Sequence, residues 1–152
     1  MAGGGRQPTA LAPKEKHDDP YCHSVSVAAV IVRKEDDRVL AIRRRDNGAW
    51  QPPGGVLEPA EDIIEGLIRE AAEEAGVIVR SPQLTGAYKH VGGPIVSLVF
   101  RCTIRRRVWD ATRKTGGETV DVRWMTRAEI VEQMDRVFAP RVLDALDYVD
   151  RP

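Results

Sequence analysis

The sequence predicts one domain with a mixed α+β fold or an α/β/α sandwich, in which helices cover a β-sheet. With 152 residues, the chain is long enough for a sizeable core and too short to expect two domains. Apolar, β-branched segments of strand length stand on both sides of one amphipathic helical segment, and two further helical segments close the chain. This order of strands, one helix, more strands and then helices is typical of such layered architectures.

The first predicted elements precede the central helix. Residues 1–20 are rich in Gly, Pro and charge, so a flexible tail is predicted there, with a partner-binding or oligomer-swapping tail as the alternative. The domain is predicted to span residues 21–152. Residues 24–32 have the pattern of a strand buried on both faces, and residues 39–43 return after a charged turn, which predicts a hairpin. A Pro-Gly bend at residues 51–55 then leads into the helix.

The central helix is predicted to begin near residues 59–61 and to end at Gly76. Proline is tolerated in a first helical turn, and acidic residues favour the same end. Gly76 suits the left-handed conformation that closes many helices. The predicted core-facing stripe of this helix consists of Ile64, Leu67, Ile68, Ala71 and Ala75.

More strands and two helices are predicted after the central helix. The last of these strands alternates, with Val120, Val122 and Trp124 expected on its inner face. Thr126 and Glu129 have capping-box spacing for a short helix. The predicted elements are strands at residues 77–79, 84–90, 95–105 and 118–125, a helix through Met134 and a last helix that opens at Pro140.

Composition narrows the classes of partner and compartment. Lysine and arginine together number 23, as do aspartate and glutamate, so no net charge draws a nucleic acid polymer or a membrane to the protein. Two cysteines are too few for a disulfide framework, and Cys102 lies in an apolar strand pattern that favours a buried thiol. No segment has the apolar length of a membrane span, and the N-terminus lacks the layout of a secretory signal. We therefore expect a cytoplasmic protein.

Three glutamates of the central helix form its most unusual feature. Glu70, Glu73 and Glu74 fall within about a quarter of the helix circumference, where their charges repel one another. A cation among them would relieve this repulsion, and Mg²⁺ is often held by a few carboxylates together with a substrate phosphate. Water bound to such a metal could attack phosphorus in line. The sequence therefore predicts a metal-binding face with Glu70 and Glu74 as the best pair of ligands, the alternative being an ordinary solvated face.

These glutamates belong to a longer pattern, G-x5-E-x7-R-E-x2-E-E-x-G, whose chance occurrence in a chain of this length is on the order of 10⁻⁶. The pattern resembles the signature box of the Nudix hydrolase family, of the MutT-like kind, and here spans residues 55–77. One position departs from the family, because Ala71 stands where a larger aliphatic residue is usual. The residues that fill the pattern are Gly55, Glu61, Arg69, Glu70, Glu73, Glu74 and Gly76, followed by Val77.

The resemblance implies an α/β/α sandwich with a mixed sheet between helices. It also implies hydrolysis of a diphosphate bond in a nucleoside diphosphate linked to another group, such as a nucleoside triphosphate or an ADP-ribose-like nucleotide. The expected cofactor is Mg²⁺, with Mn²⁺ as the alternative, and the expected partner is a small nucleotide, with a homodimer suggested by the family. A nucleotide-sensing module without catalysis is the second interpretation. An isomerase of isoprenoid diphosphates is a third, but it would need a well-placed catalytic cysteine.

The resemblance also assigns roles within the box. Arg69 orients the catalytic glutamates Glu70 and Glu73, and Glu70 is either a metal ligand or the general base. A glycine carbonyl of the entry loop, at Gly54, reaches the metal in the family. Glu61 would brace Arg69 or join a second metal, and Gly55, Glu61 and Gly76 are structural supports. From helical spacing alone, Glu65 is expected to form an ion pair with Arg69, which lies four residues later.

Candidates outside the box carry weaker signals. Several family members have, at the position of Glu118, a loop glutamate that binds metal or acts as the general base. A solvated loop acid is an equally good interpretation of Glu118. Trp50 could stack on a nucleobase or pack in the core. At most one or two of Arg43, Arg44 and Arg45 could hold phosphates, and Arg43 and Arg45 are the selected candidates. His90 could line the substrate rim, with solvent exposure as the alternative for each of these residues.

Overall fold

The computed structural model describes residues 21–107 and 117–148, so the predicted N-terminal tail lies outside the described residues. One sheet has the strand order β4-β1-β6-β5. Its central strands β1 (Ser24–Ile31) and β6 (Ile95–Arg107) run parallel, while β4 (Gly54–Val56) and β5 (Val77–His90) pair antiparallel with them at the two edges. The sheet is therefore mixed, as predicted.

A second sheet has the order β3-β2-β7 and is antiparallel. It consists of β3 (Trp50–Gln51), β2 (Val39–Arg44) and β7 (Thr119–Met125). This sheet corrects the predicted hairpin, because β1 and β2 belong to different sheets, and an isolated bridge between Val32 and Val39 replaces the expected ladder between them. Both edges of β1 are already paired, with β4 on one side and β6 on the other, so no edge is left for β2.

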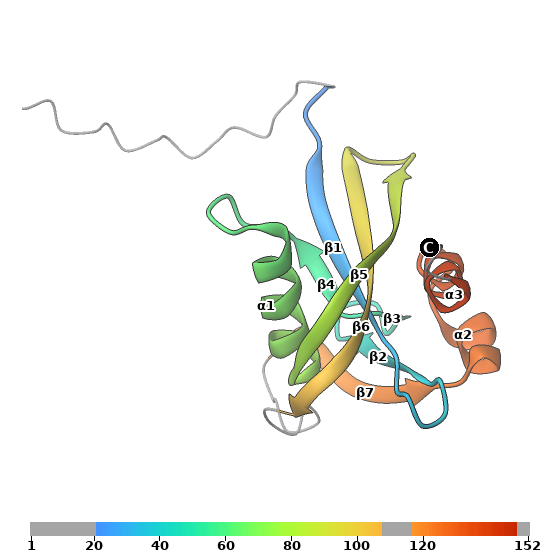
Figure 1. Cartoon of the computed structure of the whole chain (residues 1–152). Helices are drawn as coiled ribbons and strands as arrows, with labels where there is room; N and C mark the ends of the chain where they lie inside the picture. The colour runs from blue at the N-terminus through green and yellow to red at the C-terminus, as the bar shows by residue number, and fades with distance from the viewer. Residues whose placement is uncertain (1–20, 108–116, 149–152) are drawn as a thin grey trace, which may run out of the picture.

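Helices cover the strands from two sides (Figure 1). The central helix α1 (Ile63–Ala75) lies on one side, and α2 (Arg127–Gln133) and α3 (Ala139–Asp147) lie on the other. The predicted α/β/α fold class is confirmed. Among the described helices, none combines the length and the apolar character needed to cross a membrane.

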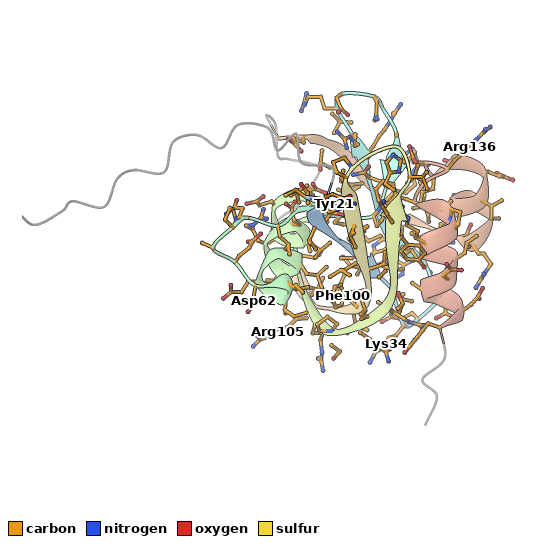
Figure 2. The ribbon with its side chains drawn as sticks, turned by 90° about the horizontal axis from the view of Figure 1, so that it is seen from above. Tyr21, Lys34, Asp62, Phe100, Arg105 and Arg136 are labelled. Carbon is orange, nitrogen blue, oxygen red and sulfur yellow. The ribbon has the colours of Figure 1, made fainter. Side chains whose placement is uncertain are left out.

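Strand β1 supplies both hydrophobic cores because its side chains alternate between two buried faces. Val27 and Ile31 pack in the core beneath α1. The same core contains Phe100 of β6, which is labelled in Figure 2. Ala28 and Val30 pack in the opposite core, beneath α2 and α3. The prediction of a strand buried on both faces is thus confirmed.

Helix α1 begins later than predicted. Asp62 is its N-cap and accepts a hydrogen bond from the Glu65 backbone, while the Glu65 side chain accepts one from the Asp62 backbone. This capping box satisfies two donors that would otherwise lack partners, which fixes the start at Ile63. The predicted end is confirmed, since Gly76 adopts the left-handed conformation with φ of 64°.

The buried face of α1 is narrower than predicted. Leu67 and Ala71 are fully buried, but Ile64 and Ile68 are 37% and 38% exposed. The helix instead buries Gly66, where an added Cβ would lie 2.3 Å from Leu57. This close approach turns the glutamate side of the helix toward the strands and leaves the two isoleucines at the margin.

Two strands also differ in detail from their patterns. The segments predicted at residues 77–79 and 84–90 form one continuous strand, β5, which bulges where Ser81 has a left-handed φ of 51°. In β7, Val122 and Trp124 pack against the α1 core as predicted, but Val120 is 43% exposed. The predicted capping box of α2 is confirmed, whereas α3 begins one residue before the predicted Pro140, at Ala139, with Pro140 in its first turn.

The two cysteines should react very differently with thiol reagents. Cys22 is exposed, whereas Cys102 is 1% exposed and burial raises the pKa of its thiol to about 12. Because the thiolate is the nucleophile, we expect the native chain to consume one equivalent of a disulfide reagent at pH 8 and the denatured chain two. A Cys22→Ser variant should consume none when native, and a rapid second equivalent in native wild type would contradict the buried position of Cys102.

Candidate active site

Three carboxylates line a cavity of about 220 Å³ between α1 and the edge strand β4. Glu70 and Glu74 come from α1, and Glu118 comes from the loop before β7. The rest of the lining consists of Ile42, Arg44, Gln51, Gly54, Gly55 and Val56. The fold thus brings Glu118, which is far away in sequence, next to two glutamates of the box.

The two glycines of β4 allow close approach of its neighbours, β1 at Gly54 and α1 at Gly55. A Cβ at Gly54 would lie 2.1 Å from the backbone oxygen of Val27, and one at Gly55 would lie 2.5 Å from Oε1 of Glu70. Gly54 therefore excludes a side chain, whereas a side chain at Gly55 would displace the Glu70 carboxylate. The Gly54 N–H donates a hydrogen bond of 3.1 Å to Oε2 of Glu74, which fixes this carboxylate against the strand.

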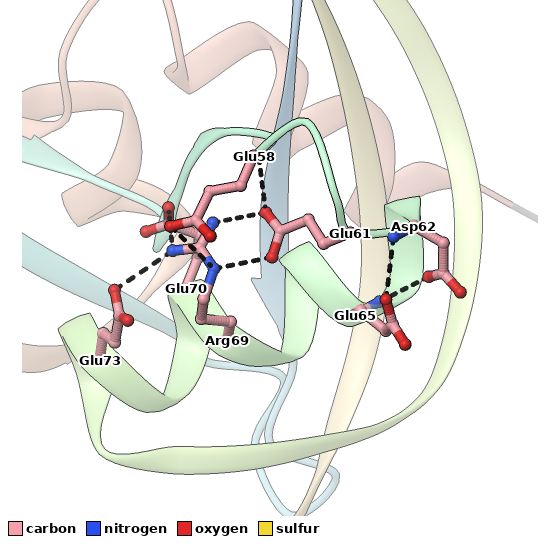
Figure 3. A network of polar contacts seen from close by, with 7 residues as sticks. All are labelled: Glu58, Glu61, Asp62, Glu65, Arg69, Glu70 and Glu73. Atoms are coloured by element: carbon pink, nitrogen blue, oxygen red, sulfur yellow. Dashed lines mark hydrogen bonds and ion pairs between the residues drawn. The ribbon is translucent and has the colours of Figure 1, made fainter. Parts of the chain in front are cut away.

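Arg69 gathers the remaining carboxylates of the box (Figure 3). Its Nη2 and Nε donate to the two oxygens of Glu61, at 2.6 and 2.8 Å. Its Nη1 donates to Glu70 at 2.9 Å and to Glu73 at 3.3 Å. The expected contact between Glu61 and Arg69 is thus present. The expected pair of Glu65 with Arg69 is wrong, because the Glu65 carboxylate binds the Asp62 backbone in the capping box.

The pKa values of Glu74 and Glu61 are shifted in opposite directions. The pKa of Glu74 is raised to about 8, chiefly by burial and also by the charges of Glu70 and Glu118, while the Gly54 hydrogen bond acts in the opposite direction. The hydrogen bonds from Arg69 and the Glu58 backbone lower the pKa of Glu61 to about 2. Glu74 and Glu118 therefore line the cavity without an ion pair among the described residues, whereas Glu61, Glu70 and Glu73 share the single charge of Arg69.

The donor set of the cavity fits a magnesium ion. Within the described residues, no three His, Cys, Asp or Glu side chains form a ready-made cage for a metal. Mg²⁺ does not require one, since it is usually bound by one or two carboxylates together with water and substrate phosphates. Glu70 and Glu74 supply such oxygen ligands, and the raised pKa of Glu74 reflects a charge that a cation would compensate.

Two proposed metal ligands have other surroundings. Glu73 lies outside the cavity lining, is 55% exposed and contacts Arg69. Gly54 lines the cavity, and its N–H binds Glu74. The structure thus brings together Glu70, Glu74 and Glu118 and leaves Glu73 on the outer side of the Arg69 network.

A larger cavity of about 360 Å³ adjoins the carboxylates. The two cavities share Arg44, Gln51 and residues 54–56, so they form one continuous site. The larger one lies between β1, β6 and the start of α3, and more of its lining is apolar than polar. Its polar and aromatic side chains are those of Ser26, Arg44, Asn47, Gln51, His90, Ser97, Asp135, Phe138 and Arg141.

Of the predicted substrate residues, only His90 lines this cavity. Trp50 is 8% exposed in the core, with the guanidinium of Arg123 4.8 Å from its ring centre. Arg43 donates to the Gly48 carbonyl and Arg45 to the Gly117 carbonyl. Successive residues of a strand point to opposite faces, so Arg44, between Arg43 and Arg45, lines the site in their place.

Arg44 was one of three arginines considered for phosphate binding, but sequence reasoning did not select it, and it missed the contribution of α3. Arg44 lines both cavities and pairs with Asp46. Arg141 lies over the rings of Tyr88 and Phe138, with its guanidinium carbon 5.0 and 5.7 Å from their centres. Alternation along β2 is the signal that could have selected Arg44. No local pattern marks Arg141, which reaches the cavity through the packing of α3.

The ion pair of Glu61 should make stability depend on pH. Its folded pKa of about 2 lies below the ordinary value of 4.5, so ionised Glu61 stabilises the fold above about pH 4.5 and loses this effect as pH falls. We expect wild type to exceed Glu61→Gln in its urea midpoint at pH 7, with a gap that narrows toward pH 3. Glu132→Gln, on the exposed surface of α2, should show no gap, and a gap independent of pH would contradict the assignment.

Comparisons with known proteins assign this fold and site to one family of hydrolases. The family model of the NUDIX domain matches residues 23–146. A MutT-like protein of Streptomyces ambofaciens is 47% identical over 137 residues, which cover 90% of this chain and 86% of that protein. An ADP-ribose pyrophosphatase of Methanocaldococcus jannaschii is 33% identical over 53% of this chain and 51% of its own length. The solved NUDIX hydrolase of Nitrosomonas europaea has a TM-score of 0.67 and 29% identity, covering 82% of this chain and 86% of that one.

The chain belongs to the Nudix family. The predicted enzyme class, a hydrolase acting on pyrophosphate bonds, is confirmed. The matched range lies inside the predicted domain of residues 21–152, whose limits remain a prediction.

Proposed function

We propose that the protein is a Mg²⁺-dependent pyrophosphohydrolase of a small nucleotide, with Mn²⁺ as the alternative metal. The substrate class is a nucleoside diphosphate linked to a further group. The observation that carries this proposal is the continuity of the two cavities, one lined by carboxylates and the other largely apolar. A nucleotide has the same division, because its phosphates are anionic and its base is flat and mostly apolar.

The phosphates would lie beside Glu70 and Glu74, with Arg44 at the junction of the cavities. A metal held by these carboxylates would neutralise phosphate charge and supply an activated water. Arg44 is placed to bind a phosphate oxygen, although its pairing with Asp46 means that the substrate would share it. Arg69 holds Glu70 in position by its 2.9 Å hydrogen bond.

The general base stays open between Glu70 and Glu118. Glu70 lines the cavity, and a hydrogen bond from Arg69 fixes its carboxylate. Glu118 lines the same cavity, and no described residue donates a hydrogen bond to its side chain. Comparing the pH dependence of kcat in Glu70→Gln and Glu118→Gln would separate them, since the variant that lacks the base loses the acidic limb of the profile.

The nucleoside would occupy the larger cavity, where Phe138 and Arg141 present flat surfaces. A base could stack there, because aromatic rings and guanidinium planes both stack on nucleobases. The similarity to a MutT-like protein and to an ADP-ribose pyrophosphatase supports a nucleotide substrate and leaves its identity open between a nucleoside triphosphate and an ADP-ribose-like molecule.

A substrate panel tests this proposal. The protein would be incubated with nucleoside triphosphates, ADP-ribose, dinucleoside polyphosphates and nucleotide sugars, with Mg²⁺ or Mn²⁺, and the phosphate-containing products identified. We expect cleavage of a diphosphate bond that depends on metal and is lost in Glu74→Gln. Binding of a nucleotide without turnover of any compound would favour the sensing module instead.

A further inference from the structure

A third cavity lies apart from the candidate active site. Its volume is about 320 Å³, close to that of the nucleoside cavity, and it shares no lining residue with either active-site cavity. It opens where the ends of β1, β5, β6 and β7 meet. Its apolar walls are Val32, Ile104 and the side chain of Trp124.

Positive charge predominates around this cavity. Arg33, Lys34 and Arg80 line it, against a single acid, Glu35. Arg33 is already paired with Asp36, at 2.8 Å between Nε and Oδ1. Lys34 and Arg80 are both exposed, and neither has an ion pair or side-chain hydrogen bond with any residue in the described ranges. Two cations are thus available to an anionic ligand.

The backbone presents Arg80 through an unusual local conformation. Ser81, directly after Arg80, has a left-handed φ of 51°, and the pairing of β5 with β6 shifts between Arg80 and Gln83. A left-handed φ is unfavourable for residues other than glycine, and such bulges commonly redirect a side chain. The strand therefore departs from regular geometry at the residue that brings charge to the cavity, opposite Thr103 of β6.

Trp124 gives the cavity a flat, rigid wall. The guanidinium of Arg33 lies 4.8 Å from its ring centre, which fixes both side chains. Its Nε1 is buried, and no described residue accepts a hydrogen bond from it. The wall thus combines an aromatic edge, a fixed guanidinium and an unused donor.

We infer that this cavity is a second, non-catalytic binding site for a small phosphate ester. Arg80, Lys34 and the Thr103 hydroxyl would bind the phosphate, since cations and hydroxyl donors match its oxygens. Val32, Ile104 and Trp124 would contact the organic part. The volume lies within the range of small-molecule sites. The inference does not depend on which nucleotide is hydrolysed.

Binding would be measured on the full chain by NMR, through the indole N–H resonance of Trp124, assigned with a Trp124→Phe variant. AMP and inorganic phosphate are the probes, with EDTA present so that the carboxylate cavity holds no metal. We expect both to shift the Trp124 signal saturably, AMP more tightly than inorganic phosphate, and both less tightly as salt increases. Arg80→Glu should weaken AMP binding at least about tenfold, with Lys34→Glu as a second variant.

Arg136→Glu is the matched control, because it makes the same charge change at an exposed residue that lines none of the three cavities. Figure 2 shows Arg136 and Lys34 at separate places on the surface. This control should bind AMP as wild type does. The inference is overturned if the Trp124 signal does not respond, if the Arg80 and Arg136 variants weaken binding equally, or if inorganic phosphate binds as tightly as AMP.

Discussion

Replacement of Glu74 by glutamine is expected to lower kcat by about 10³-fold or more while the protein remains folded. Glutamine keeps an oxygen that can accept the 3.1 Å hydrogen bond from Gly54, so α1 should still dock on β4. It removes the negative charge that makes this position a ligand for a divalent cation. Glu70→Gln should have a comparable effect, because Glu70 lines the same cavity. Steady-state kinetics with thermal unfolding of each variant would check both parts.

Glu73 provides a comparison with Glu70 and Glu74 within the same box. Glu73→Gln should reduce kcat much less, since Glu73 is 55% exposed and lies outside the cavity. Glu132→Gln, on the exposed side of α2, should have no effect. Near-normal turnover in both Glu70→Gln and Glu74→Gln would refute the assignment of these ligands, whereas a Glu73→Gln loss as large as theirs would return Glu73 to the metal site.

Alanine at two adjacent glycines should produce opposite kinds of damage. At Gly54 the added Cβ would lie 2.1 Å from the Val27 oxygen and 2.9 Å from the Ala28 Cα, both backbone atoms of a central strand. Because this backbone cannot yield without breaking pairing, we expect Gly54→Ala to lower the free energy of unfolding by about 3 kcal/mol. Chemical denaturation measures this directly.

At Gly55 the obstacle is the end of a flexible side chain, since the added Cβ would lie 2.5 Å from Oε1 of Glu70. Because Glu70 can rotate away, the Gly55→Ala variant should retain most of the free energy of unfolding. It should lose activity, because the Glu70 carboxylate then leaves the cavity. Gly92→Ala is a suitable control, as its nearest neighbour is the His90 ring at 3.2 Å on an exposed turn. Equal destabilisation at Gly54 and Gly55 would contradict this distinction.

The predictable part of the site was the part encoded by local spacing. One helical turn separates Glu70 from Glu74, so their common face follows from the geometry of the helix whatever surrounds it. The contact of Glu61 with Arg69 was expected only from the family resemblance. The spacing rule failed for Glu65, because the N-cap competed for its carboxylate and prevailed.

Features created by long-range packing could not be read from the sequence. The assumption that neighbouring strands pair predicted a hairpin of β1 with β2, yet β1 is enclosed by β4 and β6. The nucleoside cavity lies between β1 and the start of α3, and no sequence motif predicts that Ser26 and Arg141 line the same cavity. Even the exposed isoleucines of α1 follow from how the strands meet the helix rather than from its periodicity.

The Arg69 network has a consequence for the apo state. One guanidinium binds Glu61 from the preceding loop and two glutamates from α1 itself, so the protein carries an internal cation among three of its clustered acids. Folding therefore need not await a metal, unlike in domains that a structural ion holds together. A chelator should abolish turnover yet leave a cooperative unfolding transition, so the enzyme would recover on simple re-addition of the ion without refolding.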